Sequence, residues 1–77
     1  MTTQEITAKM NTYFDMEYQQ TKRLLGNPPS WVDSVREVKN STLQRCLGIT
    51  FFVQELGVPF NQIEASYEEF RKKIEDL

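Results

Sequence analysis

Two short segments rich in glycine and proline divide the 77-residue chain and constrain its fold more than any other feature. We call them stops, because each is expected to end a helix. The first stop, residues 26–30, contains two consecutive prolines, and the second, residues 57–59, reads Gly-Val-Pro. Proline lacks the amide hydrogen that a helix interior requires, and glycine readily adopts the left-handed conformation that ends a helix. Between the stops, apolar residues recur at the spacing typical of helices. We therefore expect residues 1–77 to form one small all-α domain, a compact bundle of three to four helices.

The first and last segments carry capping signals. Thr2 and Glu5 have the spacing of a capping box, in which each side chain accepts a hydrogen bond from the other residue's backbone amide. This pattern predicts a first helix at about 3–25. Asn61 is suited to cap a last helix, which we expect at about 62–76. The apolar stripe of that helix comprises Ile63, Tyr67, Phe70, Ile74 and Leu77.

The segment between the two stops allows two interpretations. Ser30 is suited to cap a helix, and the polar residues 40–42 prefer caps and turns to helix interiors. We therefore expect a short helix at about 31–39 and a longer one at about 42–56. A single long helix is the alternative, because the apolar positions stay roughly in phase. Gly48 costs about 1 kcal/mol relative to alanine inside a helix, so we expect another backbone to approach it closely.

The residue types needed for catalysis and metal binding are scarce. The chain has no histidine, one cysteine and three scattered glycines. It therefore lacks the commonest general base, a second thiol for a disulfide within the chain, and a glycine-rich phosphate loop. We expect no enzyme activity, no cofactor, no metal site and no small-molecule substrate. Cys46 is in phase with Ile49 and Val53, so we expect it to be a small buried hydrophobe.

Residues 53–70, VQELGVPFNQIEASYEEF, resemble the helix-turn-helix motif of DNA-binding regulators. Gly57 takes the place of the turn glycine, and Val58 and Ile63 take the buried positions around it. The resemblance implies a recognition helix whose exposed side would carry acidic residues, which DNA phosphates repel. These residues include Glu64, Glu68 and Glu69. The resemblance makes a helix-turn-helix-like DNA-binding regulator the alternative function. Because of the acidic residues, however, we do not expect a nucleic-acid partner.

Large apolar residues and acidic residues are the candidates for binding a protein partner. Phe51 and Phe52 are adjacent, so they cannot both face one side of a helix, and we expect one of them at the surface. Trp31 is either a core anchor or an exposed hot spot. The acidic last helix would offer a negative surface to a basic partner. The candidate set is Trp31, Phe51, Phe52, Glu64, Glu68 and Glu69.

These features predict a non-catalytic protein–protein interaction module or small regulatory protein. Its partner would be another protein or a second copy of itself, in a homodimer. The net charge of −2 gives no general attraction for nucleic acid or anionic lipid. The first ten residues lack the pattern of a signal peptide, and the longest apolar run is too short to cross a membrane. We expect a soluble cytoplasmic protein, which in size and composition resembles small proteins of bacterial and phage genomes.

Overall fold

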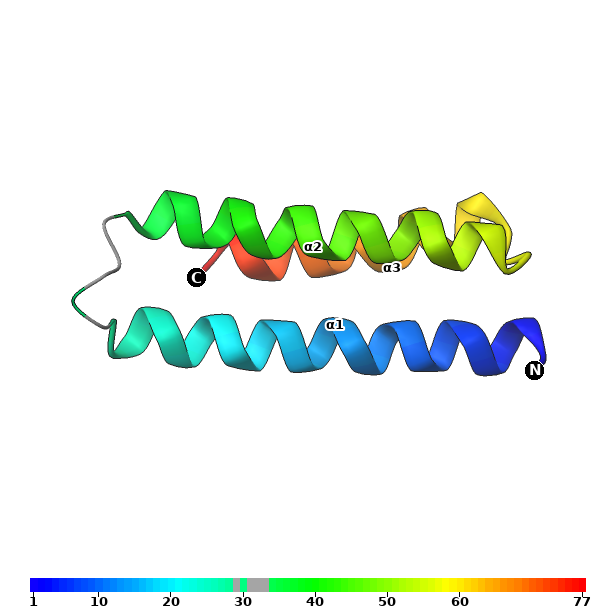
Figure 1. The fold of residues 1–77 in the computed structure, drawn as a ribbon, viewed down its shortest axis with the longest axis horizontal. Helices are drawn as coiled ribbons and strands as arrows, with labels where there is room; N and C mark the ends of the chain where they lie inside the picture. The colour runs from blue at the N-terminus through cyan, green and yellow to red at the C-terminus, as the bar shows by residue number, and fades with distance from the viewer. Residues whose placement is uncertain (29, 31–33) are drawn as a thin grey trace.

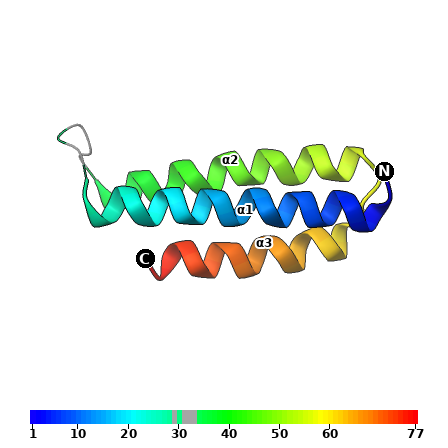
Figure 2. The same ribbon diagram turned by 90° about the horizontal axis from the view of Figure 1, so that it is seen from below.

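In the residues that the structure describes, the protein forms three helices that run alternately up, down and up (Figure 1). The computed structural model describes residues 1–28, 30 and 34–77. Helix α1 spans Thr3–Gly26, α2 spans Val35–Glu55 and α3 spans Phe60–Glu75. The bundle measures 42 × 19 × 15 Å, and each helix packs against the other two (Figure 2). The all-α bundle expected from the sequence is confirmed, with three helices in the described part of the chain.

Helix α1 begins at the predicted capping box. The Glu5 amide donates to Thr2 Oγ1 at 3.1 Å, and the Thr2 amide donates to Glu5 Oε1 at 3.3 Å. These two bonds satisfy amides that the first helical turn leaves without a partner. The helix then continues to Gly26, one residue beyond the predicted end.

The predicted division of the middle segment into two helices is wrong. Helix α2 runs unbroken through residues 40–42, and its cap is Ser34, whose Oγ accepts from the Glu37 amide at 3.3 Å, rather than Ser30. Thr42 does not break the helix, because its hydroxyl donates to the Val38 carbonyl oxygen at 3.1 Å within α2. The predicted start at residues 31–33, including Trp31, lies outside the described residues.

Helix α3 begins two residues earlier than expected. Its N-terminal cap is Pro59, which makes no side-chain cap hydrogen bond, so Asn61 lies inside the helix and does not cap it. The Pro59 carbonyl oxygen instead accepts from the amides of Gln62 and Ile63. Gly57 has a φ of 100°, a conformation that glycine adopts without the strain other residues suffer. Gly57 thus ends α2 as predicted, and the fixed φ of Pro59 leads directly into α3.

The core lies along the axis between the three helices. The Phe14 ring of α1 stacks on the Phe70 ring of α3, with 4.9 Å between centroids, and meets the edge of Tyr67 at 6.3 Å. Cys46 contributes to this core from α2 and is fully buried, as predicted. The buried apolar residues are Met10, Phe14, Cys46, Val53, Val58, Ile63, Phe70 and Ile74.

Candidate protein-interaction surface

The side of α2 that faces away from the bundle is its most unusual surface. Phe51 and Phe52 are both 61% exposed, although the sequence predicted only one of them at the surface. The helix turns by about 100° per residue, so these rings lie on either side of a line running along the outside of α2. We call this region the α2 outer surface. It comprises Gln44, Arg45, Gly48, Phe51, Phe52 and Glu55, all of them exposed.

The core-facing side of α2 explains why both phenylalanines are exposed. Thr50 precedes Phe51 and Val53 follows Phe52, and both of these smaller residues are buried. Holding Thr50 and Val53 toward the axis turns the two residues between them outward. A helix that is apolar on nearly every side is usually surrounded by partners. Helices α1 and α3 cover only part of its circumference, and two large aromatic rings are left uncovered.

Gly48 lies one turn before the two phenylalanines. A Cβ atom built on this glycine would meet nothing within 4 Å. The expected close approach of another backbone is therefore absent from the described part of the chain. The reason is that Gly48 points away from both neighbouring helices, as its exposure shows. The α2 outer surface thus combines two projecting rings with a bare stretch of helix backbone.

An apolar groove continues from Phe52 toward α1. It encloses about 290 Å³ at the end of the bundle that holds the α2–α3 turn. Leu56, which is half exposed, stands beside Phe52 on one wall, and Lys9 is the charged residue of the lining. The remaining lining residues are Met1, Ile6, Met10, Tyr13, Ile49 and Val53. Exposed apolar area therefore extends beyond the two phenylalanine rings.

Charged residues flank the rings along α2. Arg45 Nη2 donates to Glu17 Oε2 of α1 at 2.9 Å, and the Glu17 carboxylate raises the pKa of Arg45. The Arg45 side chain is nevertheless 55% exposed, so its other guanidinium donors remain accessible. Glu55 lies at the other end of the surface and forms no ion pair with the described residues.

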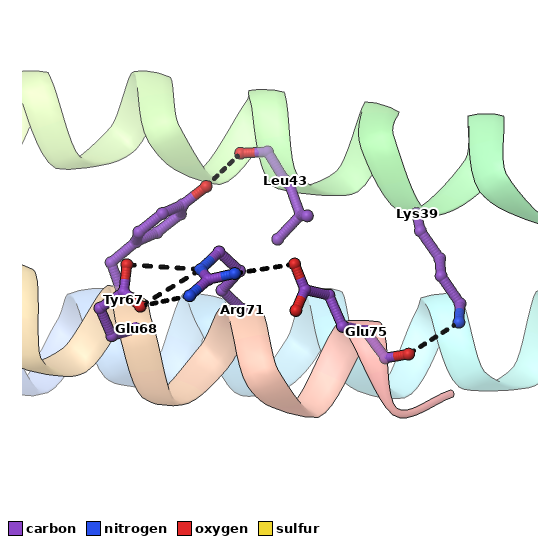
Figure 3. A network of polar contacts seen from close by, with 6 residues as sticks. All are labelled: Lys39, Leu43, Tyr67, Glu68, Arg71 and Glu75. Carbon is purple, nitrogen blue, oxygen red and sulfur yellow. Dashed lines mark hydrogen bonds and ion pairs between the residues drawn. The ribbon is translucent and has the colours of Figure 1, made fainter.

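The three glutamates predicted as an acidic surface on α3 have different surroundings. Arg71 binds Glu68 at 2.6 Å and Glu75 at 2.8 Å (Figure 3), and the hydrogen bonds from Arg71 lower the pKa of Glu68. The Glu68 charge is therefore largely balanced within α3. Glu64 and Glu69 are exposed, but about 140° of helical rotation separates them. The structure thus exposes both Phe51 and Phe52 on α2, whereas Glu64 and Glu69 lie on different parts of the α3 surface.

Two contacts join α2 and α3 beside this ion-pair network. The Tyr67 hydroxyl donates to the Leu43 carbonyl oxygen at 3.4 Å, and Lys39 Nζ donates to the Glu75 carbonyl oxygen at 3.0 Å (Figure 3). The second contact satisfies a carbonyl in the last turn of α3, where no further residue of the helix can do so. These contacts fix α3 against α2 and leave the α2 outer surface uninvolved.

Cys46 has the environment of a structural residue. It is fully buried, and burial raises the pKa of its thiol to about 12, with a further contribution from Glu17. The reactive thiolate is therefore strongly disfavoured at neutral pH. Within the described residues, no group of three acidic or cysteine side chains is placed to hold a metal ion. No helix among them is both long and apolar enough to cross a membrane.

Comparison of the chain with protein-family models, curated proteins and solved structures finds no match. The surface geometry of this chain is therefore the guide to its function. That geometry contains an exposed apolar face on α2 and a buried thiol in the core.

Proposed function

We propose that this protein is a non-catalytic protein–protein interaction module that binds its partner through the α2 outer surface. One observation carries the proposal: Phe51 and Phe52 are adjacent and both 61% exposed, next to the bare backbone of Gly48. Isolated exposed apolar residues are common in proteins, but a contiguous patch marks a binding surface. The apolar groove at Leu56 extends this patch toward α1.

The energetics of covering the two rings support the proposal. A phenylalanine side chain buries about 200 Å², so covering the exposed 61% removes roughly 120 Å² from water per ring. At about 25 cal/mol per Å², each ring contributes on the order of 3 kcal/mol to binding before the entropic costs of association. Two such anchors side by side are enough to form the centre of a hot spot.

The arrangement of α2 and α3 supports protein binding over the alternative function. A helix-turn-helix crosses its two helices at about 90–120°, whereas α2 and α3 run antiparallel along their length (Figure 2). Glu64 and Glu69 are exposed on different parts of α3, so either exposed part would bring a glutamate toward the phosphates of a duplex. DNA binding by residues 53–70 stays a prediction. Retardation of duplex DNA in a low-salt mobility assay would favour it.

The proposal also places the protein in the cytoplasm, as the sequence predicts. A lone buried Cys46 in a small domain suits a reducing compartment, since small secreted domains usually depend on several disulfides. Buried thiols of this kind serve as core hydrophobes and need no oxidation partner.

Site-specific photocrosslinking in the native cell tests the proposed function. A photoreactive phenylalanine analogue replaces Phe52 in one strain and Met16 in a control strain. Met16 is a matched control because it is 54% exposed on α1, away from the α2 outer surface. We expect illumination to give a discrete crosslinked protein product from position 52 and none from position 16. Equal yields from the two positions, or no product from position 52, would refute the proposed function.

A further inference from the structure

We infer that the partner is a second copy of this chain, which packs its own α2 antiparallel against the α2 outer surface. This inference rests on the proposed function and adds the identity and register of the partner. In the inferred dimer the two α2 helices cross with Thr50 of each chain at the same level. A two-fold axis relates the chains, so every contact occurs twice.

Shape complementarity is the first argument for this register. Gly48 precedes Thr50 by two residues and Phe52 follows it by two, so Phe52 of one chain lies over Gly48 of the other. The space above Gly48 is empty, because a Cβ there would meet nothing within 4 Å. On each side of the two-fold axis, the exposed Phe52 ring of one chain thus packs on the exposed backbone at Gly48 of the other. The neighbour that the sequence predicts close to Gly48 is then the Phe52 ring of the second chain.

Charge complementarity is an independent argument for the same register. Arg45 precedes Thr50 by five residues and Glu55 follows it by five, so each Arg45 faces the partner's Glu55. Glu55 is exposed and unpaired within the described part of the chain. Arg45 contacts Glu17 through Nη2, and its remaining donors can reach a second carboxylate. A parallel arrangement would instead place like charges together at both positions.

The spacing of these four residues is that of a helix–helix seam. Arg45, Gly48, Phe52 and Glu55 follow one another at intervals of three, four and three residues. Such alternation keeps all four on one face of a helix that packs along another helix. The 21 residues of α2 extend over about 31 Å, so all four residues lie within one straight helix–helix interface. Phe51 and Leu56 flank the seam and cover its edges.

The first test measures the mass of the purified full-length chain by sedimentation equilibrium over micromolar concentrations. We expect wild type to approach twice the 9.1 kDa monomer mass as its concentration rises. Gly48→Leu fills the gap above the backbone, so it should remain at the monomer mass throughout. Because the space at Gly48 is open in the monomer and leucine favours the helix more than glycine does, this variant should keep the helical fold and be at least as stable as wild type at a concentration where both are monomeric. A wild-type monomer at every concentration, or a Gly48→Leu dimer as stable as wild type, overturns the inference.

The second test reads the register through charge reversal. Glu55→Lys places two lysines opposite arginines, so its dimer should dissociate at least about tenfold more readily. Glu69→Lys makes the same charge change on α3 and should associate like wild type. The complementary variant carries Arg45→Glu together with Glu17→Gln, which avoids setting two carboxylates side by side. We expect neither variant to dimerise well alone and an equimolar mixture to dimerise like wild type. A mixture as weak as its components overturns the register.

The crosslinking experiment separates this inference from the proposed function. A product of twice the chain mass from position 52 agrees with both. A product containing a different protein, together with a wild-type monomer in sedimentation, retains the proposed function and overturns the inferred homodimer. If position 52 gives no crosslinked product, both the proposed function and the inferred homodimer are refuted.

Discussion

Replacing Thr42 by valine should destabilise the fold, and replacing Thr21 as well should restore much of the loss. The two hydroxyl oxygens lie 2.8 Å apart between α1 and α2, and the residues are 3% and 1% exposed. Thr42 also donates to the Val38 carbonyl oxygen, so the hydrogen between the two threonines comes from Thr21. Valine has nearly the same shape as threonine and a similar helix propensity. Thr42→Val also removes the bond to Val38 and a 3.4 Å bond that Thr42 accepts from Arg45, so only the comparison of single and double variants isolates the bond between the two hydroxyls.

The stability lost in each variant depends on which threonine hydroxyl is left without a hydrogen-bond partner. Thr42→Val leaves the Thr21 hydroxyl buried without its acceptor, at a cost of about 1–2 kcal/mol after partial relief by a backbone carbonyl of its own helix. Thr21→Val costs less, about 0.5 kcal/mol, because the Thr42 hydroxyl keeps the Val38 carbonyl oxygen. The double variant buries two methyl groups in place of two hydroxyls and should lie within about 0.5 kcal/mol of wild type.

Urea unfolding followed by far-UV circular dichroism measures these four stabilities as a double-mutant cycle. All four proteins are compared at one low concentration, since dimer formation would add to the apparent stability. We expect a coupling energy of about 1–2 kcal/mol between Thr21 and Thr42. A double variant whose loss equals the sum of the single losses would show that the hydroxyls do not interact and would refute the reasoning.

Three further predictions follow from single sites. Gly57→Ala should cost about 1–2 kcal/mol, because a Cβ is strained at a φ of 100°; unchanged urea midpoints would contradict this. Arg45→Ala should destabilise the fold by about 1–2 kcal/mol, because it leaves the nearly buried Glu17 carboxylate without its ion-pair partner. Thermal melts should show that combining Arg45→Ala with Glu17→Gln recovers most of this loss. Burial raises the pKa of the Cys46 thiol from 9.0 to about 12. As the pH rises above 9, the unfolded chain therefore loses this proton before the folded chain does. The free energy of unfolding should fall by up to about 1.4 kcal/mol per pH unit over this range. Cys46→Ala should remove that part of the slope and leave the part due to the two tyrosines whose pKa burial also raises.

Local signals were sufficient to predict the ends of α1 and the apolar stripes that form the core. The capping box at Thr2 is a contact between residues three apart, and sequence spacing alone reveals it. The continuity of α2 was only the alternative prediction, from the phase of its apolar positions, because residues 40–42 favour caps locally. The Thr42 side chain is held instead by Thr21, which is 21 residues away in the chain. Tertiary burial thus overrides the local preference.

The candidate surface was predicted in part. The adjacency of Phe51 and Phe52 indicated that one of them would be exposed, but the structure was needed to show that Thr50 and Val53 take the core positions. The contact between Glu17 and Arg45 was not predicted, because the two residues are 28 apart in the chain. A signal for it exists: Glu17 lies on the same apolar stripe as Met10 and Phe14, and a carboxylate there requires a partner.

The most direct test of the account is to measure the exposure of Phe51 and Phe52 in free and bound protein by hydroxyl-radical footprinting. Met16, on the outside of α1, serves as the internal reference. We expect both rings to be oxidised readily in dilute purified protein. In concentrated protein and in extracts of the native cell they should be several-fold protected relative to Met16. Equal oxidation of the rings under all conditions would show that nothing covers the α2 outer surface and would contradict its role in binding.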